Sequence, residues 1–267
     1  MCADTSSLLT YAEPRTGRIV LCGTDEAHLA VAARRLKLAS GHAPVASAPR
    51  PAYRETITRS GSVDYTHKKI VGAAGEYARV KMRYEPLPAG SGFAFASEVV
   101  HGTLPAEFIL AVETATRASL DNGVAAGFPV IDFRAVLCYG AYHDQDSSTL
   151  TFEIAARAAF QAGLTKATPI VLEPIMRVEI TTPDSNVDGV AQDLQSRRGV
   201  VAAMDSREGA RVIIAKVPLA EMFGYAAALK AVAPGLGRWS MLFEEYAPIP
   251  DGSDDPRFPG AVGARIA

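Results

Sequence analysis

The stretch Leu172-Glu173-Pro174-Ile175-Met176-Arg177-Val178-Glu179-Ile180-Thr181 decides the fold of the last part of the chain. Met176, Val178 and Ile180 alternate with polar residues, which is the period of a strand that buries one face. Sequence patterns typical of helices and of further strands follow this strand along the chain. Their order indicates the fold to which the strand belongs.

Five further elements are predicted after this strand. They are a helix capped by Asp184 or Ser185, strands at 200–204 and 212–217, a helix over about 220–233, and a strand at 239–246. Gly199 is expected to end the first of these helices. The resulting order βαββαβ over residues 169–250 is that of the ferredoxin-like fold. The tail at 251–267, rich in Gly, Pro and Asp, is predicted to be disordered.

Residues 50–168 predict a second unit that mixes helices and strands. Apolar residues alternate with basic ones over Val80–Tyr84, so a half-buried strand is expected there. Further expected elements are a helix from Pro105 to near Gly123, a β-rich run at 129–139 and a helix over about 148–166. The chain as a whole is therefore expected to be an α+β protein.

Residues 1–49 predict a smaller unit. Two short strands at 8–11 and 19–22 flank a turn, a helix begins near Thr24, and another strand leads into the Pro-rich stretch 43–51. This order matches the trailing ββαβ of a ferredoxin-like fold, without its central first strand. Because a missing central strand leaves unpaired edges, we expect a partial, rearranged unit or one that a partner chain completes.

The composition is that of an ordinary globular protein. Of 267 residues, 48% are hydrophobic and 21% are charged, which excludes disorder of the whole chain. The formal net charge of −2 argues against binding of nucleic acid through bulk charge alone. No apolar run reaches the length of a membrane span, and the N-terminus lacks the layout of a signal peptide. Cys2, Cys22 and Cys138 have no paired spacing, as expected of reduced thiols, so a cytoplasmic location is predicted.

Several strings occur in an order and spacing that resemble the elongation factor G family, over about residues 8–250. They include Glu85-Pro86-Leu87, Tyr142-His143-Asp144-Gln145-Asp146-Ser147-Ser148, the opening stretch, and Arg197-Arg198-Gly199. The resemblance implies the end of domain III, then domain IV, which is an S5-like elongated α/β domain, and then the ferredoxin-like domain V. It also implies that the tip of domain IV reaches the decoding region of the ribosome.

The resemblance implies candidate RNA contacts in two places. In the tip of domain IV they are Tyr142, His143, Asp144, Gly72, Gly75, Tyr77 and Arg79, and in domain V they are Arg197 and Arg198. Aromatic and imidazole rings at a tip can stack on RNA bases. Simpler roles remain open, because residues 146–148 can cap the following helix and arginines at a helix C-terminus favour its dipole. A zinc site or a serine hydrolase at His143 is disfavoured, since neither a second ligand nor a nucleophile elbow accompanies it.

Two departures from the family's pattern limit the expected function. Neither a Gly-x-x-x-x-Gly-Lys-Ser/Thr loop nor an Asn-Lys-x-Asp motif occurs, so we expect no GTPase activity from this chain by itself, and no cofactor or metal. The family's tip loop Gly-Gly-Arg-Gly-Gln-Tyr-Gly reads Gly72-Ala73-Ala74-Gly75-Glu76-Tyr77-Ala78 here. The loss of an arginine at Ala74 and the gain of an anion at Glu76 both disfavour contact with RNA phosphates, although Arg79 nearby can restore part of the charge.

The leading expectation is a ribosome-associated, non-enzymatic module that resembles the C-terminal arm of elongation factor G. The alternative is a C-terminal fragment or split-gene product of such a GTPase, whose G domain lies on another segment or on a separate GTPase chain. A decayed remnant that no longer binds ribosomes is a third possibility, against which the retained Tyr142–Ser148 string argues. No membrane partner is expected, and the sequence leaves the oligomeric state open.

Overall fold

The computed structural model describes residues 9–12, 19–22, 26–40, 51–71, 74–207, 210–233 and 238–250. Gly72, the strand predicted just before the Pro-rich stretch and the predicted tail at 251–267 lie outside these residues. The chain divides into two compact units, Met1–Pro49 and Arg50–Ala267, and each is described by itself.

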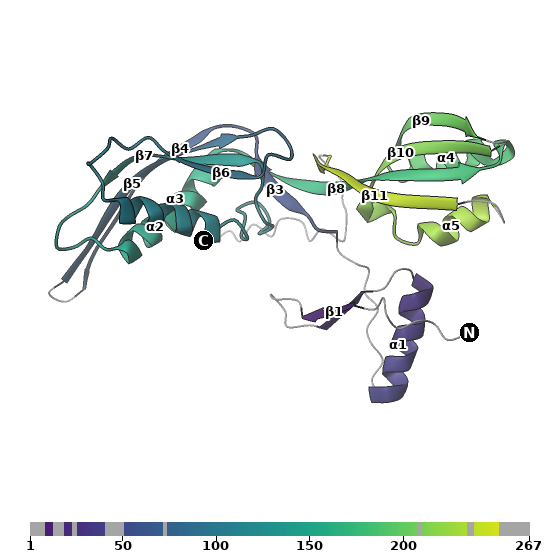
Figure 1. Cartoon of the computed structure of the whole chain (residues 1–267), viewed down its shortest axis with the longest axis horizontal. Helices are drawn as coiled ribbons and strands as arrows, with labels where there is room; N and C mark the ends of the chain where they lie inside the picture. Colours follow the sequence, from purple (N-terminus) through teal and green to yellow (C-terminus); the bar gives the residue numbers. More distant parts are fainter. Residues whose placement is uncertain are drawn as a thin grey trace, which may run out of the picture. The chain divides into compact units, whose positions relative to one another are not determined.

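The first unit contains one hairpin and one helix among its described residues. Strands β1 (Leu9–Ala12) and β2 (Ile19–Cys22) pair antiparallel, with Leu9 opposite Cys22 (Figure 1). Helix α1 spans Glu26–Ser40. The two strands and the helix lie within two residues of their predicted positions.

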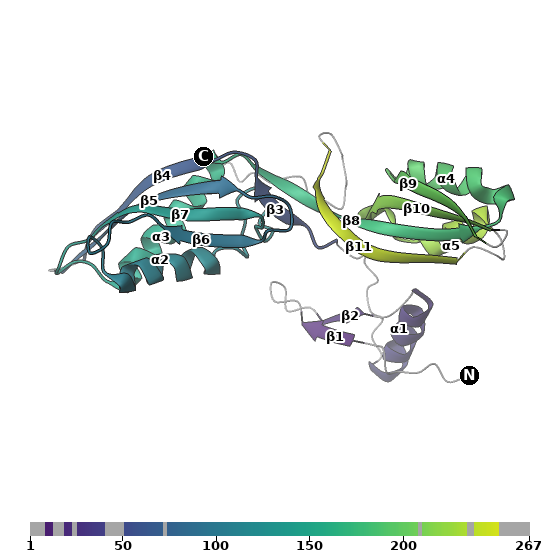
Figure 2. The ribbon, with the colours of Figure 1, turned by 45° about the horizontal axis from the view of Figure 1, so that its top comes forward.

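A four-stranded sheet forms the first part of the second unit. Its strands, in spatial order, are β4 (Gly61–Val71), β5 (Ala74–Pro86), β7 (Phe133–Ala141) and β6 (Phe93–Ser97). Strands β6 and β7 are parallel, and the other pairs are antiparallel (Figure 2). Helices α2 (Ala106–Ala118) and α3 (Thr149–Lys166) pack on one face of this sheet (Figure 1). The opposite face carries neither helix.

The alternation along β5 places a hydrophobic core between the sheet and the two helices. Val80, Met82 and Tyr84 are fully buried and join Phe152 and Phe160 of α3 in one cluster. Fully burying a side chain of this size contributes roughly 1.5–3 kcal/mol. The basic residues between them therefore lie on the open face, as the period of two requires.

A second sheet has the order β11-β8-β10-β9. Its strands are β8 (Pro169–Thr182), β9 (Val200–Arg207), β10 (Ala210–Pro218) and β11 (Arg238–Pro248), and its helices are α4 (Val187–Ser196) and α5 (Tyr225–Val232). Short 3₁₀ turns, η2 (Asp184–Asn186) and η3 (Leu219–Glu221), precede the two helices. The central pair β8 and β10 buries Val178, Ile180, Ile213 and Ala215 against both helices. This strand order confirms the predicted ferredoxin-like fold.

A short strand, β3 (Arg54–Ile57), extends this second sheet. It pairs antiparallel with the first residues of β8, Arg54 lying opposite Leu172. The carboxylate of Glu55 on β3 is fully buried and accepts hydrogen bonds from the backbone N–H groups of Ala125 (2.8 Å), Ala126 (2.7 Å) and Phe128 (3.0 Å). Glu55 thereby fixes the segment that connects α2 to β7.

The structure corrects several predicted helix ends; α2, for example, ends at Ala118 rather than near Gly123. Helix α4 begins after Asn186, and neither Asp184 nor Ser185 caps it with a side chain. It ends at Ser196, three residues before the predicted stop at Gly199, and Arg198 takes the left-handed conformation with φ of 59°. Helix α5 begins at Tyr225 rather than near residue 220, because Gly224 turns the chain with φ of 75°. None of the helices in the described part of the chain combines the length and the hydropathy that a bilayer span requires.

Candidate functional site

The loop from Tyr142 to Ser148 connects β7 to α3 and is fastened to β5. The backbone N–H of Tyr77 donates to the carbonyl oxygen of Asp146 at 2.8 Å. The Ser147 Oγ donates to the carbonyl oxygen of Tyr77 at 2.6 Å. These two bonds span about seventy residues of sequence, and they join the two segments predicted to form the tip into one surface.

Within the loop, the backbone around His143 is fixed while its ring is exposed. The His143 N–H donates to the Ser147 Oγ at 2.9 Å, and the Ser147 N–H donates to the His143 carbonyl oxygen at 3.0 Å. The His143 Nδ1 lies 3.3 Å from the Asp146 Oδ2, and the side chain is 59% exposed. An exposed ring on a fixed backbone is suited to contact a ligand, because little backbone entropy is lost on binding.

The three residues at the end of the loop have different roles. Ser148 is the N-cap of α3 and forms a capping box with Thr151, whose N–H donates to the Ser148 Oγ at 3.2 Å. Asp146 and Ser147 hold the loop against β5 instead. The capping role that remained open for all three residues therefore belongs to Ser148.

Gly75 packs directly beneath the Asp146 side chain. A Cβ added to Gly75 would lie 2.6 Å from the Asp146 Cγ, closer than real side chains approach. A side chain at position 75 would therefore displace the Asp146 carboxylate, and this contact, not a positive φ, is what favours glycine there. Gly72, the other glycine predicted at this tip, lies outside the described residues.

The remaining predicted residues of this loop differ in exposure. The Tyr142 ring lies 5.7 Å from the ring of Phe108 on α2, and Tyr142 is 41% exposed. One part of Tyr142 is therefore packed and the other is accessible. Asp144 is exposed next to His143.

Two pairs of polar, ionisable side chains link β4 to β5 near the tip. Arg79 donates to both carboxylate oxygens of Asp64, at 2.9 and 2.7 Å, and these hydrogen bonds lower the pKa of Asp64. The Arg79 guanidinium also lies 5.9 Å from the centre of the Tyr139 ring. Glu76, the anion at the family's glutamine position, lies 2.9 Å from the His67 Nε2. Arg79 and Glu76, the two charged residues that bear on the altered tip loop, are thus each met by a partner within the same sheet.

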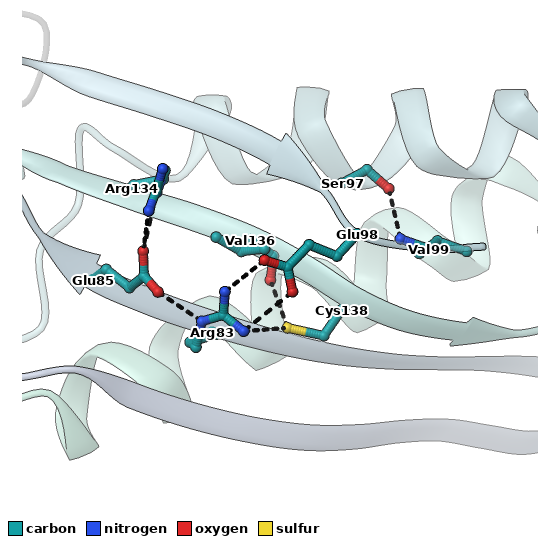
Figure 3. Close-up of polar contacts among 8 residues, drawn as sticks. All are labelled: Arg83, Glu85, Ser97, Glu98, Val99, Arg134, Val136 and Cys138. Carbon is teal, nitrogen blue, oxygen red and sulfur yellow. Dashed lines mark hydrogen bonds and ion pairs between the residues drawn. The ribbon is translucent and has the colours of Figure 1, made fainter. Parts of the chain in front are cut away.

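A second ionic network lies on the open face of the sheet, and the sequence analysis missed it. Arg83 donates to Glu85 at 2.7 Å and to Glu98 at 2.7 Å, and Arg134 donates to Glu85 at 2.6 Å (Figure 3). Hydrogen bonds from Arg134 and Arg83 lower the pKa of Glu85, and the hydrogen bond from Arg83 lowers that of Glu98. Cys138 lies beside Arg83, and burial raises the pKa of its thiol. The alternation of charges along β5 was the available signal, but the partners come from β7 and from the residue after β6.

Arg197 and Arg198 lie in the turn between α4 and β9, apart from the tip in the fold. Arg198 forms two hydrogen bonds with Glu173, at 2.8 and 2.9 Å, and contacts Glu221 at 3.3 Å. Arg197 donates to Asp193 at 3.0 Å and to the Glu221 carbonyl oxygen at 2.6 Å. Both guanidinium groups thus have carboxylate partners within the protein.

Comparisons with known proteins agree with this architecture. The family model described as elongation factor G, domain IV matches residues 49–168, and the model of the elongation factor G C-terminus matches residues 170–255. The chain is 44% identical over 253 residues to elongation factor G of Anaplasma marginale (strain Florida), covering 95% of this chain and 37% of that protein. It is 45% identical over 249 residues to elongation factor G of Ehrlichia canis (strain Jake), covering 93% of this chain and 36% of that protein.

A solved structure gives the same result at the level of the fold. The crystal structure of a protein from Thermus thermophilus matches with a TM-score of 0.82 and 37% identity, over 91% of this chain and 36% of the other. The chain thus spans little more than a third of the length of the relatives that it matches. In sequence and in fold, it belongs to the elongation factor G family and is equivalent to the C-terminal part that follows the GTPase region.

Proposed function

We propose that this chain binds the ribosome through the tip formed by the Tyr142–Ser148 loop and the end of the β4–β5 hairpin. The observation that carries the proposal is the fixed loop backbone that displays the His143 ring. The fastening of this loop to Tyr77 supports it, because a preorganised contact loses less entropy on binding. The chain would act in the cytoplasm, without GTPase activity or a cofactor of its own.

The test is co-sedimentation of the purified chain with ribosomes over a series of salt concentrations. We expect binding at low salt that weakens as salt increases, since RNA phosphates supply much of the attraction. His143→Ala should weaken binding, while Lys230→Ala on α5 should leave it unchanged. If the wild-type chain does not sediment with ribosomes at low salt, the proposed ribosome binding is wrong. A larger effect of Lys230→Ala than of His143→Ala would move the contact to the second sheet.

As a second candidate function, we propose that this chain works together with a GTPase region that lies on another segment or on a separate chain. The lengths of the relatives favour this second candidate, because the chain is equivalent to 36–37% of them. Mixing the chain with the separately produced N-terminal part of such a relative should then increase ribosome-dependent GTP hydrolysis. No increase above the rate of that part alone would argue for a module that acts by itself.

A further inference from the structure

We infer that the open face of the four-stranded sheet, at its end near the tip, is a second RNA-contact surface that binds phosphates through Lys68 and Lys81. We call it the open-face patch and define it by Lys68, Arg79, Lys81 and Tyr139. The inference rests on the proposed ribosome binding and extends it to a surface that the tip loops do not include. Its RNA partner is identified by charge and ring chemistry alone.

Strand register places the members of the open-face patch side by side. Lys81 lies opposite Asp64 on β4 and opposite Tyr139 on β7, and Lys68 lies opposite Tyr77. The contacts of Arg79 with Asp64 and with the Tyr139 ring join residues of this same face. The intervening residues of β5 point into the core and are fully buried. Arg79 and Lys81, two alternate residues of β5, therefore lie on the same face as Lys68 and Tyr139.

The patch carries more positive than negative charge. Among the residues directly opposite Lys68, Arg79 and Lys81 on the neighbouring strands, Asp64 is the one with a carboxylate, and Arg79 donates to both of its oxygens. Among the described residues, neither Lys68 nor Lys81 has a carboxylate within ion-pair distance. Both lysines are exposed. The charge of Lys81 acts on Asp64, whose pKa is lowered by the hydrogen bonds from Arg79 and further by Lys81. In a chain with a formal net charge of −2, three cations beside this carboxylate on one strand pair are still a local excess of positive charge suited to phosphates.

The other end of the open face does not share this property. There Arg83 and Arg134 are matched by Glu85 and Glu98 in a closed network (Figure 3). Because each cation in this network already has a carboxylate partner, it offers phosphates little net attraction. The charge pattern thus confines the predicted contact to the half of the face near the tip.

The neighbouring ring favours RNA over an acidic protein as the occupant. Tyr139 is 48% exposed and lies directly beside Lys81. A sheet surface that presents an exposed aromatic ring beside cations is the arrangement on which many RNA-binding domains stack bases. An acidic protein could form ion pairs with the cations, but it has no bases to stack on the Tyr139 ring.

The first test is the binding of the full chain to a short fluorescent RNA stem-loop, followed by anisotropy over a series of salt concentrations. Each phosphate contact contributes roughly 0.7–0.9 to the slope of log affinity against log salt. Lys68→Ala and Lys81→Ala should each reduce the slope by about that amount and weaken binding several-fold at low salt. Lys166→Ala is the matched control, since this exposed lysine ends α3 on the opposite face. Unchanged slopes in both patch variants would overturn the inference.

The second test is lysine acetylation of the wild-type chain in its sedimented ribosome complex, read by mass spectrometry. We expect Lys68 and Lys81 to become protected while Lys166 remains reactive. If the chain sediments but Lys81 stays as reactive as in the free chain, the open-face patch is excluded and the tip contact stands. If the chain does not sediment with ribosomes, the proposed function fails. The salt slopes measured with the RNA stem-loop then decide by themselves whether the open-face patch binds RNA. Protection on the ribosome with unchanged stem-loop binding would assign the patch to a protein partner and overturn the RNA contact.

Discussion

Replacing Glu55 with alanine should remove the hydrogen bonds that hold the segment between α2 and β7 against β3. The Glu55 carboxylate is fully buried and accepts three backbone N–H groups, those of Ala125, Ala126 and Phe128. Each buried donor that loses its acceptor costs about 1–3 kcal/mol, and more when the acceptor was charged. Since the three amides share one carboxylate and water can partly replace it, we expect a total loss of about 4 kcal/mol.

Hydrogen exchange of the full chain measures this loss of free energy locally, at the amides that Glu55 binds. A local loss of about 4 kcal/mol corresponds to roughly thousandfold faster exchange of the amides at 125–128, at about 1.4 kcal/mol for each factor of ten. Glu55→Gln keeps one carboxylate-like oxygen and should lose about half as much free energy. Glu113→Ala is the control, because it removes only the partly exposed pair with Arg117, worth at most about 0.5 kcal/mol.

If these amides exchange as slowly in Glu55→Ala as in Glu113→Ala, Glu55 does not hold the segment in place. In that case the amides would have found other acceptors at no cost. A loss of protection spread evenly over the whole chain would instead indicate global unfolding. We expect the largest change at residues 123–130, because the Glu55 carboxylate lies so close to Gly123 that a Cβ there would collide with it.

Three further predictions concern the tip, the core and the ionic network. Gly75→Ala should push the Asp146 carboxylate aside and weaken ribosome binding in the sedimentation assay, with a stability loss of only about 1 kcal/mol. Gly163→Ala should destabilise the chain by about 1–3 kcal/mol in urea unfolding, because the new Cβ would collide with the buried ring of Tyr84. Since its arginine partners lower the pKa of Glu85, its contribution to stability is complete above the unfolded pKa of about 4.3 and is lost as pH falls through the lower folded pKa. A carboxyl NMR titration that finds the pKa of Glu85 at or above about 4.3 would contradict this assignment.

Local patterns predicted most of the secondary structure. The alternation over Val80–Tyr84 predicted a buried face, and those alternate residues are fully buried. The order of elements from β8 onward predicted the ferredoxin-like topology, and the strand order confirms it. These features depend on neighbours in sequence, so periodicity and turn residues are sufficient to find them.

Contacts between distant residues could not be predicted in the same way. The bonds from Tyr77 to the 142–148 loop join residues about seventy positions apart, and no pattern in either segment specifies the other. Gly199 was predicted to end α4, but the residue in the left-handed region after this helix is Arg198. Gly199 is needed for another reason, because a Cβ there would lie 2.6 Å from the Leu194 carbonyl oxygen. A glycine in a sequence thus indicates a steric restriction without saying which one.

The energetics of Arg198 bear on the proposed contacts with RNA. A non-glycine residue in the left-handed region costs about 1 kcal/mol or more, so Arg198 needs compensation. Its two hydrogen bonds to Glu173, whose side chain is only 4% exposed, provide it. Moving the guanidinium to an RNA phosphate would leave that carboxylate buried and unpaired, at a cost of about 3–5 kcal/mol. One phosphate contact is worth less than this, so the energetics favour contacts by groups that are already exposed, such as His143 and Lys81.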